Sequence, residues 1–257
     1  MGAPDKAFYL AALARDTQAF ADTARRGMQP DVPGCPGWTV HDLVIHLGDV
    51  YTFWTLVVES RARDAGPIRE RLTPEREQRN NDPAFRQPDF VLEWFQRCAG
   101  KLETTLAAAD PDEPVFTWWP PDQRAGWVQR RMAQETAVHR WDIEQSHGIE
   151  QPIERGLARD GVDEALDVHL PDRVADTDVR GNGESFHFHQ TDGDGEWVVR
   201  FGPDGVLVSR EHLKADVAVR GSASDLLLFQ WGRVGAERLE VIGDISLLDR
   251  YFELAPP

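Results

Sequence analysis

Residues 134–145 read Q134-E-T-A-V-H-R-W-D-I-E-Q145 and lie inside a helix predicted over about 125–147, which Gly148 ends. Glu135 and His139 are four residues apart, so a helix places both side chains on one face. Such a pair is compatible with a solvated surface, with a buried polar pair, or with two of the three protein ligands of a metal ion. A third ligand elsewhere in the chain would distinguish these alternatives.

An inward-facing histidine on another helix is the candidate for the third ligand. A second predicted helix begins at Thr39, which forms a capping pair with Asp42 three residues later. Its apolar residues form one wide face, made of Val40, Leu43, Leu47, Val50, Phe53, Trp54 and Val57. His46 lies on this face. Helix bundles build metal sites from facing helices, and His46 with Glu135 and His139 suits Zn²⁺ with an open fourth position or non-haem Fe²⁺.

The composition argues against several classes of partner. The 44 acidic residues exceed the 28 basic ones and give a formal net charge of −16, which repels phosphate backbones and anionic lipid surfaces. No apolar run approaches the ~20 residues that span a bilayer, and the N-terminus lacks the basic start and apolar core of a signal peptide. The two cysteines do not form the spacing pattern of a disulfide framework. We therefore expect a cytoplasmic protein with no nucleic-acid or membrane partner.

The periodicity of the chain changes from mainly helical to mainly strand-like after about residues 149–155, which predicts two domains, residues 1–150 and 151–257. The first is predicted to be a four-helix bundle, with helices at about 5–26, 39–63, 89–109 and 125–147. The segment 65–88 is charged and contains four prolines, so it is predicted to be a long loop with one helical turn. Long loops in compact domains often serve as functional lids.

The second domain is predicted to be a small α+β unit with a mostly antiparallel sheet. A short helix is expected at about 156–167, and period-two alternation over 174–220 then predicts strands. The expected elements after the short helix are strands at 185–191, 197–202, 206–210 and 215–221, a helix at 222–233, a strand at 239–244 and a terminal helix at 245–252. Ser222 or Ser224 is the expected N-cap of the helix at 222–233, and D-G-D-G-E forms a tight hairpin turn between the first two strands.

These motifs resemble a known family. The segments C35-P-G-W-T-V-H-D-L-V-I-H-L-G-D49 and E135-T-A-V-H-R-W-D142 are similar to those of the actinobacterial mycothiol-dependent maleylpyruvate isomerase family, part of the DinB-like superfamily of metal-binding four-helix bundles. The later segments G221-S-A-S-D-L-L-L-F-Q-W-G-R233 and V241-I-G-D244 resemble the C-terminal domain of that family, which is similar to sterol carrier proteins. The resemblance covers nearly the whole chain and implies a bundle followed by a sterol-carrier-like α+β domain.

The resemblance also implies a site and an activity. It carries over as metal ligands His46, Glu135 and His139, with zinc as the metal and mycothiol as the thiol cosubstrate. Coordination deprotonates a thiol, which would then add to a small electrophilic substrate for isomerisation or S-transfer. Two alternatives stay open, because fold and ligand set do not determine a reaction. One is a non-catalytic metal-binding or small-ligand-binding protein, and the other is a non-haem iron enzyme on the same residues.

Further residues are candidates for supporting roles. Asp142, three residues after His139, is either a group that orients this ligand or a carboxylate on the helix surface. A carboxylated substrate suits arginines, which bind carboxylates through two hydrogen bonds. The candidates are Arg220 and Arg233 at the ends of C-terminal elements, together with Arg79 or Arg86 in the predicted loop.

The remaining histidines and cysteines have simpler interpretations. His41 lies about 140° around its helix from His46 and is interpreted as solvated. His187 and His189 alternate along a strand and share a face, which is interpreted as a solvent-facing surface rather than a metal site. Cys35 is interpreted as part of a structural turn and Cys98 as a core residue. The tryptophans are assigned to packing, with one or two of them lining the pocket.

Overall fold

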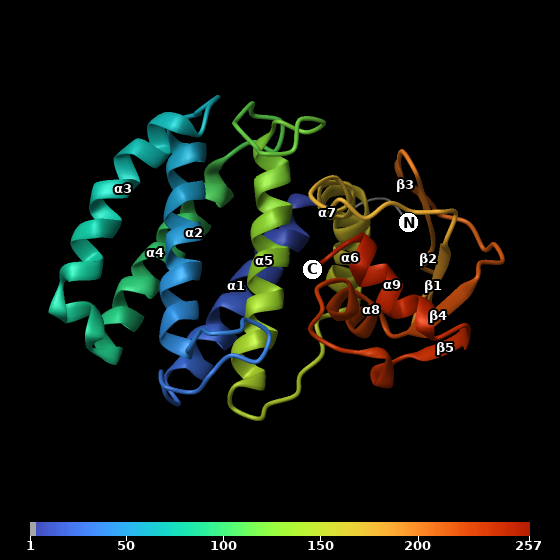
Figure 1. Ribbon diagram of the computed structural model, residues 1–257. Coiled ribbons are helices and arrows are strands. Elements are labelled where there is room, and N and C mark those ends of the chain that lie inside the picture. Colours follow the sequence, from blue (N-terminus) through green and yellow to red (C-terminus); the bar gives the residue numbers. More distant parts are fainter. Residues whose placement is uncertain (1–3) are drawn as a thin grey trace. The chain divides into compact units, whose positions relative to one another are not determined.

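The computed structural model describes residues 4–257, which form two compact units divided between Gln151 and Pro152 (Figure 1). The first unit is helical and the second combines helices with one sheet. No helix within residues 4–257 has both the length and the apolar character that crossing a bilayer requires.

The first unit contains a four-helix bundle with one additional helix. The bundle helices are α1 (Lys6–Ala24), α2 (Val40–Glu59), α4 (Pro88–Ala108) and α5 (Ala125–Gln145). Helix α1 packs against α5, and α2 packs against α4. The capping box predicted at the start of α2 is present, with the Thr39 side chain and the Asp42 side chain each bonded to the other's backbone. It fixes the start of α2, the helix that carries His46.

The segment 65–88 was wrongly predicted to be a loop. It forms α3 (Gly66–Asn81), which lies beside α2, and a 3-10 helix (Pro83–Arg86) (Figure 1). The two buried side chains of α3, Ile68 and Leu72, are four residues apart and form an apolar stripe within a charged sequence. Arg79 near its C-terminal end forms a two-point ion pair with Asp49 of α2. Packing against α2 therefore outweighs the weak local preference of a segment rich in charge and proline.

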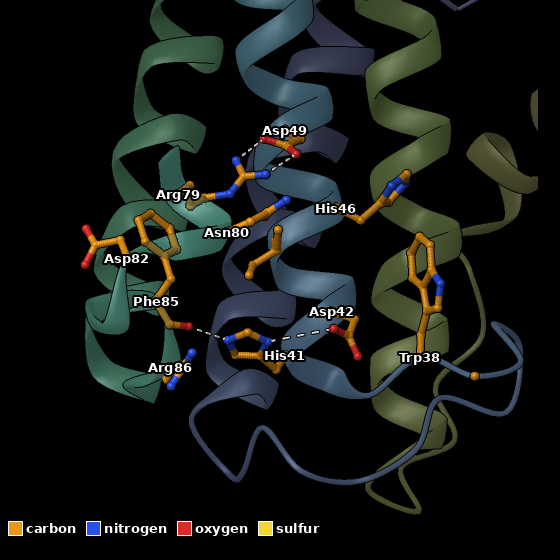
Figure 2. A pocket seen from close by; sticks show the side chains of 12 residues that line it. Trp38, His41, Asp42, His46, Asp49, Arg79, Asn80, Asp82, Phe85 and Arg86 are labelled. Carbon is orange, nitrogen blue, oxygen red and sulfur yellow. Dashed lines mark hydrogen bonds and ion pairs between the residues drawn. The ribbon is translucent and has the colours of Figure 1, made fainter. Parts of the chain in front are cut away.

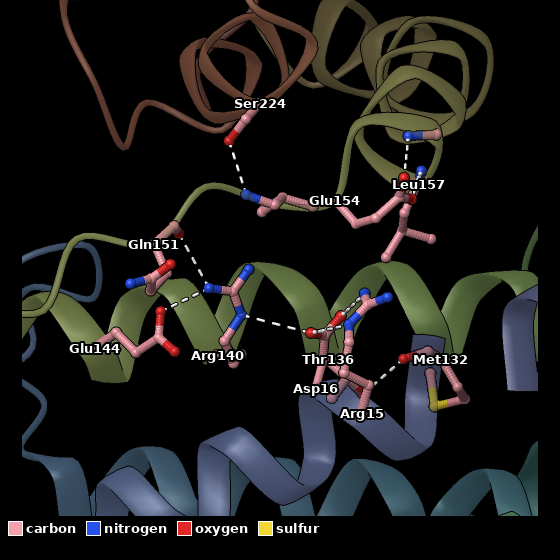
Figure 3. Close-up of polar contacts among 12 residues, drawn as sticks. Arg15, Asp16, Met132, Thr136, Arg140, Glu144, Gln151, Glu154, Leu157 and Ser224 are labelled. Carbon is pink, nitrogen blue, oxygen red and sulfur yellow. Dashed lines mark hydrogen bonds and ion pairs between the residues drawn. The ribbon is translucent and has the colours of Figure 1, made fainter. Parts of the chain in front are cut away.

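Polar groups inside the bundle are paired across helices. The Tyr51 hydroxyl of α2 lies 3.1 Å from the Thr17 hydroxyl of α1 and 2.7 Å from the Thr136 hydroxyl of α5. A second network surrounds Arg140, which is buried in α5 and contacts the carboxylates of Glu144, at 2.6 Å, and Asp16, at 3.6 Å (Figure 3). Such networks couple the positions of α1, α2 and α5.

The second unit begins with a longer helical region than expected. Helix α6 (Arg155–Glu164) continues through a π-helical turn (Ala165–His169) into α7 (Leu170–Ala175), so strand structure begins at Ser185 and not near residue 174. Pro171 is the kind of residue that ends a helix. Here the backbone N–H of Leu170 bonds to the carbonyl of Ala165, five residues back, and the wider turn just before the proline lets the helical region continue.

One five-stranded sheet follows, in the order β3-β2-β1-β4-β5. Its strands are β1 (Ser185–Gln190), β2 (Glu196–Gly202), β3 (Gly205–Ser209), β4 (Val217–Gly221) and β5 (Glu240–Gly243). A mostly antiparallel sheet was expected, but the sheet is mixed, because β1 and β4 run parallel at its centre while the other neighbours are antiparallel. The β2–β3 hairpin separates β1 from β4 in the sequence and allows the chain to return in the same direction.

Two helices complete the unit. They are α8 (Ala223–Gln230), capped by Ser222, and α9 (Ser246–Leu254), with a 3-10 turn at Ala236–Arg238. Phe186 and Phe188 of β1 pack their rings against Tyr251 of α9. The alternate residues of β1, His187 and His189, point to the opposite face of the sheet, where Leu207 and Ile242 are exposed.

Candidate metal centre

The structure brings together the three residues predicted to bind a metal. His46 projects from α2, and Glu135 and His139 project from consecutive turns of α5. One oxygen of Glu135, Oε1, lies 3.4 Å from His46 Nε2 and 3.2 Å from His139 Nε2. The two imidazole rings are 5.2 Å apart and nearly perpendicular. All three donor atoms lie within 4.8 Å of one another, a spacing that one cation with nitrogen and oxygen ligands spans.

Asp142 lies behind His139 on the next turn of α5. Its carboxylate oxygen is 2.9 Å from His139 Nδ1, and its side chain is 0% exposed. A hydrogen bond from Nδ1 to a carboxylate leaves Nε2 with its lone pair, and Nε2 is the atom that faces Glu135 and His46. The surface alternative for Asp142 is therefore wrong, because this carboxylate is fully buried.

Cys35 also reaches this region, which the sequence interpretation missed. It lies in the predicted turn before α2, and its thiol donates a hydrogen bond to the carboxylate of Asp142, at 3.7 Å. Cys35, His139 and Asp142 also form a cluster of potential ligand atoms within 4.8 Å. No sequence signal links them, since Cys35 and Asp142 are 107 residues apart.

The charges of the centre shift the pKa values of Glu135 and His139 in opposite directions. Burial raises the pKa of Glu135, but the Arg131 guanidinium and His139 outweigh burial, and the pKa lies well below its usual range. Burial lowers the pKa of His139, yet Glu135 and Asp142 hold it well above its usual range. The two opposite shifts have one cause, the attraction between the Glu135 carboxylate and the His139 ring, and Asp142 adds to it from the Nδ1 side.

A cavity of about 680 Å³ opens beside His46 (Figure 2). Trp38 and His46 line one side, with their rings 4.9 Å apart, and Arg79, Phe85 and Arg86 line the other. The second wall comes from the helical segment 66–86 that was predicted to be a loop.

His41 was interpreted as solvated, and this is wrong. Its Nε2 lies 2.7 Å from the carbonyl oxygen of Phe85, so it joins the start of α2 to the 3-10 helix and lines the same cavity. The helical spacing correctly predicted that His41 lies away from the buried face of α2. It did not predict that the 3-10 helix would pack against this side of α2.

The candidate arginines differ in their contacts. Arg79 is engaged by Asp49, whereas Arg86 is exposed at the cavity and has no ion pair within residues 4–257. Arg220 and Arg233 belong to the second unit, where Arg220 pairs with Glu240 at 2.7 Å and Arg233 donates to the carbonyl of Trp231. The contacts of these two arginines do not define a substrate site.

The other two sequence interpretations have different outcomes. Cys98 is partly buried in α4 and accepts a hydrogen bond from the Thr52 hydroxyl, so its assignment to the core is close to what is observed. His187 and His189 do share a face of β1, but His187 is only 6% exposed, so a solvent-facing surface is the wrong description.

Comparison with known proteins gives matches over most of the chain. Residues 10–144 match the mycothiol maleylpyruvate isomerase N-terminal domain, and residues 156–250 match the C-terminal domain of the same family. A crystal structure of mycothiol-dependent maleylpyruvate isomerase is similar with a TM-score of 0.65 at 13% identity, covering 95% of this chain and 98% of that one. A histidine-to-alanine mutant of that isomerase gives 0.65 at 14% identity with the same coverage. The comparison with curated protein sequences gave no match.

Proposed function

This chain belongs to the mycothiol maleylpyruvate isomerase family, and from this premise we propose that it is a metal-dependent enzyme that uses mycothiol to isomerise a small electrophilic substrate, or to transfer sulfur to it. The observation that carries the proposal is the convergence of His46, Glu135 and His139 at the edge of a large cavity. Two imidazole nitrogens and one carboxylate oxygen leave a further position open to a ligand from that cavity.

We propose zinc as the metal, held by His46 Nε2, Glu135 Oε1 and His139 Nε2. When bound, it supplies a Lewis acid that lowers the pKa of a thiol enough to generate a nucleophile at neutral pH. Asp142 keeps the proton of His139 on Nδ1, so that Nε2 remains a ligand. Arg131 pairs with the other oxygen of Glu135 and holds this carboxylate ionised.

The cavity provides space for a thiol and a small substrate side by side. For a cis–trans isomerisation, the sulfur adds to the double bond, the resulting single bond rotates, and elimination re-forms the double bond and releases the thiol. Bonds and electrons balance without an oxidant, a reductant or a protein nucleophile. Trp38, Ile45 and Phe85 form the apolar part of the lining.

Arg86 is the proposed anchor for a substrate carboxylate. It faces the cavity, and no carboxylate within residues 4–257 competes for its guanidinium. Arg220 and Arg233 remain proposed substrate contacts, but Arg220 would have to exchange its bond to Glu240 for one to the substrate. Neither cysteine forms a disulfide in the described chain, and we propose a cytoplasmic location where thiols stay reduced.

The decisive experiment is metal analysis of the purified protein, followed by zinc-edge absorption spectroscopy with and without the thiol. We expect one zinc at this centre that gains a sulfur ligand when mycothiol is added. His139→Ala and Glu135→Ala should each remove one metal equivalent while circular dichroism stays unchanged. His147→Ala is the matched control. This histidine follows α5, and its Nδ1 bonds to the backbone carbonyl of Ile143 and not to a residue of the centre. A centre that retains metal in both variants, or never gains sulfur, would contradict the proposal.

A further inference from the structure

A second group of potential metal ligands lies in the second unit, on the sheet face opposite α9. His187 and His189 project from β1 on that face, and Glu196 at the start of β2 is the direct cross-strand partner of His189. His212 comes from the connection between β3 and β4. Three histidines from two separate segments therefore converge on one carboxylate.

The distances in this cluster are short. Glu196 Oε2 lies 2.5 Å from His187 Nε2, and Glu196 Oε1 lies 2.6 Å from His189 Nδ1 and 3.1 Å from His212 Nδ1. The rings of His187 and His212 are 4.9 Å apart and almost perpendicular. The four donor atoms all lie within 4.8 Å of one another.

Glu196 can accept a hydrogen bond from each of the three imidazoles, because a carboxylate has about four acceptor sites. The same convergence places four potential ligand atoms around one point, which is also what a metal ion requires. His187 is nearly buried, yet it directs a ring nitrogen towards the cluster. A cation replaces these protons with one central charge and uses each nitrogen lone pair.

The strand geometry suits such a site. Residues two apart on a strand point the same way, so His187 and His189 enter from one side, while Glu196 on the neighbouring strand enters beside them. His212 joins the group from the connection after β3, and its side chain is 75% exposed, so an ion can reach the cluster from solvent.

We propose that His187, His189, His212 and Glu196 form a second metal site that takes a divalent transition-metal ion of the zinc class. Three imidazoles and one carboxylate match the ligands and the coordination number that Zn²⁺ prefers. The bound ion would link the segment 210–216, through His212, to β1 and β2. The site is independent of the centre in the first unit and does not depend on the proposed function.

The test uses the full-length chain with His46→Ala and His139→Ala, which removes the bundle centre from the count. After chelator treatment, Zn²⁺ is titrated at pH 7.5 by calorimetry. We expect one equivalent to bind, and Co²⁺ in its place to give the visible absorption of a tetrahedral nitrogen- and oxygen-ligated ion.

Three further variants identify the ligands in this background. His212→Ala removes an exposed loop ligand without disturbing the sheet, and His189→Ala and Glu196→Gln remove two more. Each removes a proposed direct ligand and should weaken zinc binding by more than the roughly 10–100-fold loss that removal of an outer partner causes. Glu211→Gln is the matched control, because Glu211 is exposed, adjacent to His212 and outside the cluster, and its affinity should equal that of the parent.

The results that would overturn the proposal are equally defined. Either the parent binds no zinc below millimolar concentration, or His212→Ala and His189→Ala both bind it as tightly as the parent does. Circular dichroism of each variant shows that a lost equivalent reflects lost ligands and not an unfolded sheet. If the intact protein lost activity but still bound zinc at the histidine cluster of the sheet, the proposed function would fail and this second site would stand.

Discussion

Replacing Asp142 by asparagine tests how the candidate centre in the bundle is organised. Asp142 is fully buried and bonds to His139 Nδ1 at 2.9 Å, so the substitution removes one charge without creating a cavity. Loss of a partner behind a metal-bound histidine typically costs 10–100-fold in metal affinity, which is about 1.4–2.8 kcal/mol. We expect the upper part of this range if the amide presents its NH₂ group to Nδ1, because the ring proton then moves to Nε2, the ligand atom.

The assay is competition for zinc against a chelator that reports free metal, in a chain carrying His212→Ala so that only the bundle centre is counted. Glu144→Gln is the matched control, because Glu144 is also buried on α5 but contacts Arg140 and not His139. It should lose stability and keep its zinc affinity within about twofold. The reasoning is refuted if Asp142→Asn binds zinc as tightly as the parent, or if Glu144→Gln weakens binding equally.

Three further predictions concern stability and thiol reactivity. Arg140→Met leaves the buried Glu144 without its cation and removes one of the two arginines that pair with Asp16, the other being Arg15 (Figure 3), so the free energy of unfolding in urea should fall by about 3–5 kcal/mol; a fall below 1 would contradict the role of this network. Gly48→Ala should cost about 1–3 kcal/mol in the same assay, because the new Cβ would lie 2.3 Å from a Trp94 ring atom, whereas Gly100→Ala, with no atom within 4 Å, should gain about 0.5–1. Burial raises the pKa of the Cys98 thiol, so at pH 8 iodoacetamide should modify it more slowly than free cysteine, with a rate that still rises above pH 9; equal rates by mass spectrometry would refute this.

The elements with strong local signals are the ones that the sequence predicted well. The Thr39–Asp42 capping pair marks the start of α2, and Gly148 adopts the left-handed conformation after α5 ends. Helix α3 has no such signal. Its stability depends on the packing of Ile68 and Leu72 against the rest of the bundle. The local sequence, which is charged and contains an internal proline, does not reveal this packing.

The candidate centre divides in the same way. Helical spacing is local, so the shared face of Glu135 and His139 follows from the sequence, and the apolar neighbours of His46 indicate that it points inward. The position of Cys35 beside Asp142 depends on how the turn before α2 packs against α5, and that follows only from tertiary structure. The same holds for His41, whose partner is the carbonyl of Phe85 in a segment not expected to be helical.

The histidines of β1 show where local information extends further than burial arguments suggest. Alternation places His187 and His189 on one face, and the hairpin turn over 191–195 determines which residue of β2 lies opposite His189. That residue is Glu196, which was expected to lie in the turn, so the strand period alone brings together His187 and His189, and the observed hairpin register adds Glu196. Only His212 requires the tertiary path of the chain after β3. A histidine pair with this spacing, followed by a tight turn and a carboxylate in register, therefore predicts converging ligands even when an exposed strand surface is the simpler description.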